Sequence, residues 1–162
     1  MRAWFCMFVG LRVLTAQSAP GPPSEQHEFR LRNFKTESGV TLPEALVVYG
    51  TYGHLNAAKD NAVLLPSYYR TNYHGYEWLI GPGKALDPNK LFLVSTELFG
   101  NGRSSSPSNT PEPFHGPRFP VMTIRDNVNA VHRLLVEELK ILHLRAIVGY
   151  SMGARSKRFN GQ

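Results

Sequence analysis

The sequence predicts an α/β fold in which amino-terminal antiparallel strands lead into a parallel sheet with flanking helices. Two observations predict it. Several short segments are apolar throughout instead of alternating, which is typical of strands that are covered on both faces. An amphipathic helical pattern over residues 123–140 precedes one of these segments, and a strand–helix–strand order is typical of a right-handed parallel unit. The 162 residues, 42% of them hydrophobic, suffice for one domain with a buried core.

The first regular elements are two antiparallel strands. Phe29, Leu31 and Phe34 recur between polar residues, as expected for a strand that is buried on one face. Glu37-Ser38-Gly39 is expected to form a turn, because serine and glycine are among the residues that favour turns. Residues 42–49 then provide the antiparallel partner strand.

Three later segments are predicted to be buried strands. They are short and apolar, and they cover residues 61–65, 91–95 and 144–148. Between the last two lies a stretch rich in glycine, asparagine, serine and proline, residues 100–120. A loop of this length within a compact domain is uncommon and is often functional.

The clearest helix is predicted from Thr123 to Lys140 and ends near Ile141. Thr123 and Asp126 have the spacing of a capping box, with aspartate in place of the more usual glutamate. Apolar residues recur at three- and four-residue steps and predict one core-facing stripe. The stripe consists of Ile124, Val128, Val131, Leu135 and Leu139.

The formal net charge of +6 is concentrated at the two ends of the chain. Residues 1–24 carry two of the net positive charges and the last nine carry three, so the body is nearly neutral. Because the body has no basic stripe, we do not expect nucleic-acid binding. The single cysteine excludes an internal disulfide framework, and no apolar run approaches the roughly 18 residues of a membrane span.

Residues 1–24 differ from the rest and are expected to be a leader or a disordered segment. Within residues 1–19, an apolar run behind Arg2 leads to small residues around a candidate cleavage site at 16–18, as in a secretory signal. Arg12 interrupts that order, and the lack of acidic residues also fits a mitochondrial presequence. An unstructured leader without an address is the third interpretation. Localisation is therefore unknown, with the cytoplasm slightly favoured.

The motif that points to chemistry is Gly149-Tyr150-Ser151-Met152-Gly153, directly after the last predicted strand. A tight strand-to-helix turn can expose a serine hydroxyl as a nucleophile, and small flanking residues let strand and helix approach closely. The backbone N–H of Met152 would then form one half of an oxyanion hole. The alternative interpretation is an ordinary Ser–Gly turn.

Several longer segments carry a family resemblance, at 49–56, 60–65, 81–88, 100–109, 118–120, 124–128 and 149–154. In this order they resemble the amino-terminal part of the homoserine O-acetyltransferase family of α/β-hydrolase-fold acyltransferases. The resemblance covers about three quarters of the chain. It implies an incomplete α/β-hydrolase fold over residues 25–154, followed by a basic, unpatterned tail at 155–162.

The resemblance also implies covalent acyl transfer through Ser151. The serine would accept an acyl group from a thioester such as acetyl-CoA, as a substrate and not a bound cofactor. It would pass the group to an alcohol such as homoserine, whereas some relatives use other alcohols or water. The second oxyanion donor would come from the loop at 66–69, where the N–H of Tyr68 is the nearest match. Alternatively, the tyrosines of that loop only line the pocket. Full-length relatives are compatible with a homodimer, and no metal site is expected.

The chain departs from this pattern after Ser151. A serine nucleophile needs a base and a group that orients it, and this fold supplies them in the order Ser, Asp or Glu, His. No His, Asp or Glu follows Ser151, and all six histidines precede it. Only His74 is expected near the pocket, without an assigned role.

Three hypotheses follow from this departure. The chain is an acyltransferase or ester hydrolase whose other catalytic residues lie elsewhere, a non-catalytic truncated fragment, or a binding module. We expect it to be inactive alone.

Overall fold

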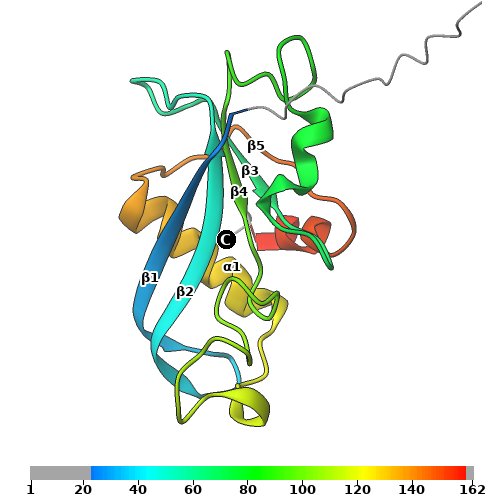
Figure 1. The fold of residues 1–162 in the computed structure, drawn as a ribbon. Helices are drawn as coiled ribbons and strands as arrows, with labels where there is room; N and C mark the ends of the chain where they lie inside the picture. The colour runs from blue at the N-terminus through cyan, green and yellow to red at the C-terminus, as the bar shows by residue number, and fades with distance from the viewer. Residues whose placement is uncertain (1–22, 160–162) are drawn as a thin grey trace, which may run out of the picture.

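The computed structural model describes residues 23–159, and Figure 1 shows their arrangement. Within this part of the chain, five strands form one sheet in the order β1-β2-β4-β3-β5. The strands are β1 Glu25–Lys35, β2 Thr41–Tyr52, β3 Ala62–Pro66, β4 Phe92–Thr96 and β5 Ala146–Ile147. The helix α1 spans Ile124–Arg133 and continues as a π-helix, η3 Leu134–Glu138. Short 3₁₀ helices are η1 Tyr73–Leu79, η2 Gly116–Arg118 and η4 Ser151–Phe159.

The sheet joins an antiparallel half to a parallel half. β1 pairs with β2, and β2 pairs with β4, in the antiparallel sense. β3 lies parallel to both β4 and β5. The predicted fold class, with antiparallel strands leading into a parallel sheet, is therefore confirmed.

The first hairpin forms where the alternating pattern predicts it. Phe29 and Leu31 are buried on one face, and the next buried residue of β1 is Phe34. The spacing from Leu31 to Phe34 is three residues instead of two, because Asn33 takes a left-handed backbone conformation with a φ of +49°. This conformation changes the face of the strand to which the following side chains point. The turn closes when the Thr36 N–H donates to the Val40 carbonyl at 2.9 Å.

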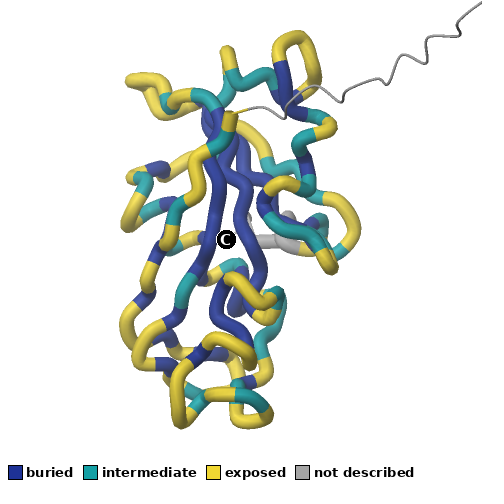
Figure 2. The backbone as a smooth tube through the Cα atoms, in the orientation of Figure 1, coloured by how far each residue is buried: buried dark blue, intermediate teal, exposed yellow. Residues whose placement is uncertain are grey.

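The two central strands, β3 and β4, are buried along their whole length, as Figure 2 shows. The third predicted buried strand, at residues 144–148, is wrong in length and in burial. β5 contains only Ala146, which is exposed, and Ile147, which is half-buried. The physical reason is position, because β5 lies at the edge of the sheet and pairs only with β3 among the described strands.

The helix begins at the predicted cap, and its buried face matches the predicted stripe in part. The Thr123 hydroxyl accepts from the Asp126 N–H, and the Asp126 carboxylate accepts from the Thr123 N–H. The predicted stripe is only partly correct, since Val131 and Leu135 are buried whereas its other members are half-buried. The buried face comprises Asp126, Asn127, Ala130, Val131, Leu134 and Leu135. Two polar side chains join this face because they bind backbone groups of neighbouring segments.

Apolar residues form two clusters on opposite faces of the sheet, because neighbouring residues of a strand point to opposite sides. Leu64 packs in the cluster that contains residues of α1 and η3. Val63 and Leu65 pack in the cluster that contains Tyr73 and Tyr76 of η1. The central strands are therefore covered on both faces, which explains their uninterrupted apolar sequence.

Serines of the long loop attach it to the free half of β2. The Val48 N–H donates to Ser104 Oγ at 3.0 Å, and the Leu46 N–H donates to Ser105 Oγ at 2.8 Å. The Ser105 N–H returns a bond to the Leu46 carbonyl at 2.9 Å. This loop therefore acts structurally, by satisfying backbone groups that β4 is too short to reach.

Candidate active site

The candidate site lies where the parallel strands end. The carboxyl ends of parallel strands meet at the same edge of a sheet, and ligands of open α/β sheets bind there. β3 ends at Pro66 and β4 ends at Thr96, while Ser151 follows β5 after a three-residue link. The fold thus brings the serine motif and the loop after β3 to one edge.

Ser151 occupies a sharp turn between strand and helix. It is the first residue of η4, it is exposed, and its φ is +51°. This left-handed conformation is uncommon for residues other than glycine, and such strain of about 1–3 kcal/mol concentrates at functional sites. The turn therefore presents the serine hydroxyl at the surface.

Two glycines allow this turn to be tight. A Cβ atom on Gly149 would lie 2.6 Å from the carbonyl oxygen of Gly153. A Cβ atom on Gly153 would lie 2.3 Å from the carbonyl oxygen of Pro66. Both distances are too short for a side chain, so the glycines let the start of η4 contact the end of β3.

The hydroxyl of Tyr76 connects the same two segments. It accepts a hydrogen bond from the Tyr150 N–H at 3.1 Å and donates one to the Pro66 carbonyl at 2.7 Å. Burial raises the pKa of this phenol, so it stays protonated and able to donate. The ring of Tyr68 packs edge-on against Tyr76 and Tyr150, with centroids 5.7 and 5.2 Å apart. The sequence alone did not single out Tyr76, because its partner Tyr150 is 74 residues away.

The two candidate oxyanion donors are the backbone N–H groups of Met152 and Tyr68, and the N–H of Tyr68 already has a hydrogen-bond partner. Met152 is the second residue of η4, where the backbone N–H groups of a helix begin. The N–H of Tyr68 donates to Thr71 Oγ1 at 3.1 Å, and that hydroxyl donates to the Tyr68 carbonyl at 2.8 Å. An acyl oxygen would have to displace the Thr71 hydroxyl to use this donor, so the assignment of Tyr68 stays a prediction.

The described histidines make no hydrogen bond to Ser151. His74 lies in η1, where its Nδ1 is 2.5 Å from Glu77 Oε1 and its ring lies against Tyr73. Glu77 Oε1 also accepts from the Tyr52 hydroxyl at 3.0 Å. The imidazole of His74 is therefore engaged in a network of its own, and none of the described side chains accepts a hydrogen bond from the Ser151 hydroxyl.

Known proteins with similar sequences and structures are esterases and acyltransferases, although no protein-family model matches the chain. An ethyl acetate hydrolase of Pseudomonas veronii is 43% identical over 120 residues, which are 74% of this chain and 34% of that protein. A homoserine O-acetyltransferase of Nautilia profundicola is 39% identical over 134 residues, which are 72% and 36% respectively. The solved structure of the acetyl esterase MekB aligns with a TM-score of 0.76 at 40% identity, over 84% of this chain and 39% of that chain.

The chain is a homologue of these esterases and acyltransferases. It has the α/β-hydrolase fold over the aligned residues, so the family resemblance drawn from the sequence motifs is confirmed. The homologue spans about a third of the length of the curated relatives that it matches. The activity, substrates and partners of these relatives therefore do not transfer directly to this chain.

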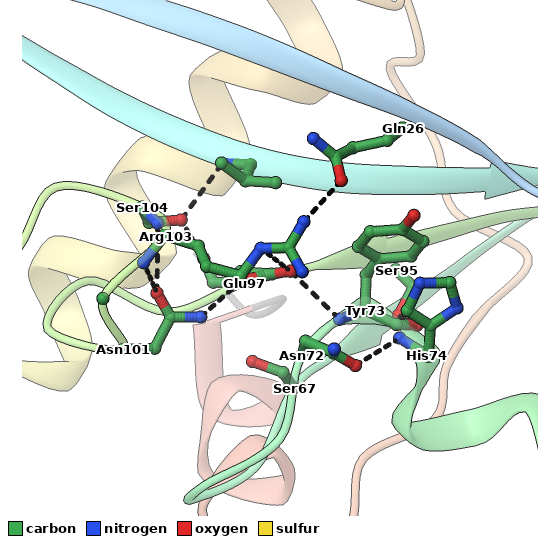
Figure 3. A network of polar contacts seen from close by, with 12 residues as sticks. Gln26, Ser67, Asn72, Tyr73, His74, Ser95, Glu97, Asn101, Arg103 and Ser104 are labelled. Atoms are coloured by element: carbon green, nitrogen blue, oxygen red, sulfur yellow. Dashed lines mark hydrogen bonds and ion pairs between the residues drawn. The ribbon is translucent and has the colours of Figure 1, made fainter.

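A buried carboxylate organises the sheet edge of this homologue, as Figure 3 shows. Glu97 follows β4 and is 1% exposed. Its oxygens accept from Asn101 Nδ2 at 2.6 Å and from the Tyr73 N–H at 3.3 Å, and Arg103 Nε lies 3.4 Å away. The Arg103 guanidinium also lies over the Tyr73 ring and donates to Gln26. Because its bonds are satisfied by these neighbours, Glu97 holds the long loop against η1.

A cavity of about 490 Å³ lies between α1 and the edge of the sheet. Apolar side chains dominate its lining, among them Leu64, Val128, Val131, Leu135, Leu142 and Ile147. Leu142 is 73% exposed at its mouth. Ser151 does not line this cavity, whereas Pro66, which contacts the serine turn, does.

The described residues give no sign of a metal centre or of a membrane span. Between residues 23 and 159, no three His, Cys, Asp or Glu side chains gather closely enough to hold a metal ion. In the same part of the chain, no helix has the length and apolar character needed to cross a bilayer.

Proposed function

We propose that Ser151 carries an acyl group in a covalent transfer reaction. Its Oγ attacks the carbonyl carbon of a thioester such as acetyl-CoA, its proton passes to a base, and the thiol leaves with a proton. An alcohol such as homoserine then attacks the acyl-serine, releases the ester and restores the hydroxyl. The observation that carries this proposal is the left-handed conformation of Ser151, at a strand-to-helix turn of an α/β-hydrolase homologue.

Hydrolysis of an ester through the same serine is the second candidate function. It differs only in the first leaving group, an alcohol, and in the final acceptor, water. The ethyl acetate hydrolase and a probable esterase of Corynebacterium glutamicum are 43% and 41% identical, against 39% for the homoserine O-acetyltransferase. These identities favour neither acceptor decisively, so the experiment must detect the acyl-serine step that both reactions share.

An experiment on this chain must supply a base that accepts the proton of the Ser151 hydroxyl. No His, Asp or Glu follows Ser151 in the 162 residues, and none of the described histidines makes a hydrogen bond to it. Added imidazole can act as the missing base, because its pKa lies near neutral pH. A general base contributes about 10²–10⁴-fold to the rate of such steps. Chemical rescue therefore separates a nucleophile that lacks its base from a serine without function.

The test measures labelling of the 162-residue chain by a fluorophosphonate, with and without imidazole. We expect slow labelling alone and labelling that rises by about 10²-fold with imidazole. Ser151→Ala should abolish the labelling, whereas Ser108→Ala, which alters an exposed serine of the long loop, should not change it. Labelling that survives Ser151→Ala, or none at any imidazole concentration, would contradict the proposal.

A further inference from the structure

We propose that Tyr76 is a positioning residue that sets the separation between the two oxyanion donors. This inference rests on the proposed function of Ser151. One donor is the N–H of Met152, two residues after Tyr150. The other is expected from the loop that begins at Ser67, directly after Pro66. Tyr76 binds the chain two residues before each candidate donor, through the Tyr150 N–H and the Pro66 carbonyl.

A single hydroxyl makes both contacts, and this links the two segments directly. The acceptor bond from Tyr150 is 3.1 Å long and the donor bond to Pro66 is 2.7 Å long. Pro66 is the last residue of β3, so it is tied to the sheet by its ladder with β4. The sheet therefore serves as the reference against which Tyr76 holds the serine turn.

The environment of Tyr76 suits a rigid connection. Its side chain is 1% exposed and packs among the apolar residues of the second cluster. Asn72 caps η1 by accepting from the His74 N–H, which fixes the start of the helix that carries Tyr76. A buried phenol whose hydroxyl is hydrogen-bonded on both sides can hold backbone groups to within a fraction of an ångström, as an oxyanion hole requires.

The packing of Gly153 makes an independent contact at the same place. Its Cα lies so close to the Pro66 carbonyl that an added Cβ would be 2.3 Å from that oxygen. Gly153 limits how closely η4 and β3 approach, whereas Tyr76 prevents them from separating. Removing only the Tyr76 hydroxyl should therefore loosen the turn without disturbing the packing beneath it.

The first experiment measures amide hydrogen exchange at Tyr150 in the full 162-residue chain. Tyr76→Phe should speed exchange of this amide by about tenfold, because its acceptor is removed. Tyr52→Phe is the matched control. It removes an equally buried hydroxyl from the same cluster, one that binds Glu77 and the Tyr73 carbonyl but not the serine turn. Equal exchange at Tyr150 in the two variants would overturn the proposal.

The second experiment measures imidazole-supported labelling of Ser151 as a function of fluorophosphonate concentration. Tyr76→Phe should lower the maximal labelling rate by about tenfold and leave the half-saturating probe concentration unchanged, because the oxyanion donors act in the transition state. Tyr52→Phe should change neither quantity by more than about twofold. A similar loss of maximal labelling rate in Tyr76→Phe and Tyr52→Phe would show that Tyr76 only stabilises the fold, and it would overturn the positioning role.

The two experiments fail in different ways. If Ser151→Ala labels as well as the wild-type chain, the proposed function is wrong, while the Tyr150 exchange still decides whether Tyr76 holds the turn. If labelling depends on Ser151 but Tyr76→Phe does not slow it, the proposed function stands and the positioning role is wrong.

Discussion

Ser151 and the glycines around it show how single residues build the candidate site. The φ of +51° at Ser151 is unfavourable for a residue with a side chain, so the neighbouring contacts must hold it. Those contacts are backbone to backbone, between Gly149 and Gly153 and between Gly153 and Pro66. A side chain at either glycine would separate the strand from the helix that follows it.

Gly153→Ala should therefore destabilise the chain and disturb the serine turn. Its Cβ would lie 2.3 Å from the Pro66 carbonyl oxygen, so the backbone must move, at a cost of about 1–3 kcal/mol. Urea denaturation measures this loss. Gly75→Ala is the control, because its Cβ would meet side chains and no backbone atom, those of Thr71 at 3.2 Å and Tyr68 at 3.3 Å, and we expect a smaller loss. Equal losses would show that the close approach at Pro66 is not the cause.

Tyr49 should make stability depend on pH in the alkaline range. Burial, with a further contribution from the Glu138 carboxylate, raises the pKa of the Tyr49 phenol to about 12. The folded chain then binds the phenolic proton more tightly than the unfolded chain, whose tyrosines titrate near about 10. The resulting contribution, about 3 kcal/mol, is fully present below pH ~10 and is lost as the pH rises to ~12.

Urea midpoints between pH 9 and pH 12 measure this dependence. Tyr49→Phe should weaken the fall in stability across this range, whereas Tyr69→Phe, which alters a tyrosine that is 73% exposed, should leave it unchanged. A fall that is the same in both variants would assign the effect to other groups.

At the scale of elements, the amino terminus of α1 joins three segments of the chain. Asp126 is fully buried, and its Oδ1 accepts from the Glu37 N–H of the first turn at 2.8 Å. Its Oδ2 accepts from the Thr123 N–H at 2.8 Å. Next to it, Asn127 Oδ1 accepts from the Phe99 N–H at 2.7 Å. Asp126 of the capping box thus attaches the helix to the hairpin turn, and Asn127 attaches it to the segment that follows β4.

Asp126→Ala should cost about 2–4 kcal/mol of unfolding free energy, because two backbone N–H groups lose their acceptor and one of them caps a helix. Thermal or urea denaturation measures the loss. Asp60→Ala removes an exposed carboxylate that binds only its neighbour Asn56, and it should cost less than about 1 kcal/mol. A cost for Asp126→Ala as small as the control would contradict the junction described above.

At the scale of the molecule, the sheet has a protected side and an open side. β1 forms one edge, and charged side chains alternate along it, which discourages pairing with other chains. β5 forms the other edge, with two residues and a cavity beside it. Leu142, which is exposed and lines this cavity, therefore leaves apolar surface accessible on this side of the sheet.

The native chain should bind an apolar fluorescent dye at this cavity. Leu142→Glu places a charge at its mouth and should lower the dye fluorescence by at least about twofold. Val121→Glu is the control, because Val121 is 75% exposed but does not line the cavity, so its fluorescence should equal that of the wild type. Equal dye binding in all three proteins would place the apolar surface elsewhere.

Local patterns were sufficient for much of the fold. The alternating hairpin, the two central strands and the capping box of α1 were all predicted, because each depends on residues a few positions apart. The Gly-x-Ser-x-Gly spacing likewise identified the turn at Ser151, where small residues and a strand end are neighbours in the chain.

Contacts between distant segments were decided only by the tertiary structure. Of the five residues 144–148, only two form β5, which lies at an edge of the sheet, and a strand's place in a sheet is not encoded in its own residues. The buried face of α1 includes Asp126 because the acceptor is needed by Glu37, 89 residues away. Tyr76 reaches Tyr150 across 74 residues, and only the folded sheet brings the phenol to the serine turn. The sequence by itself determined the first hairpin, the two central strands, the start of α1 and the serine turn, because each depends on neighbouring residues, whereas packing between distant segments determined which side chains hold them together.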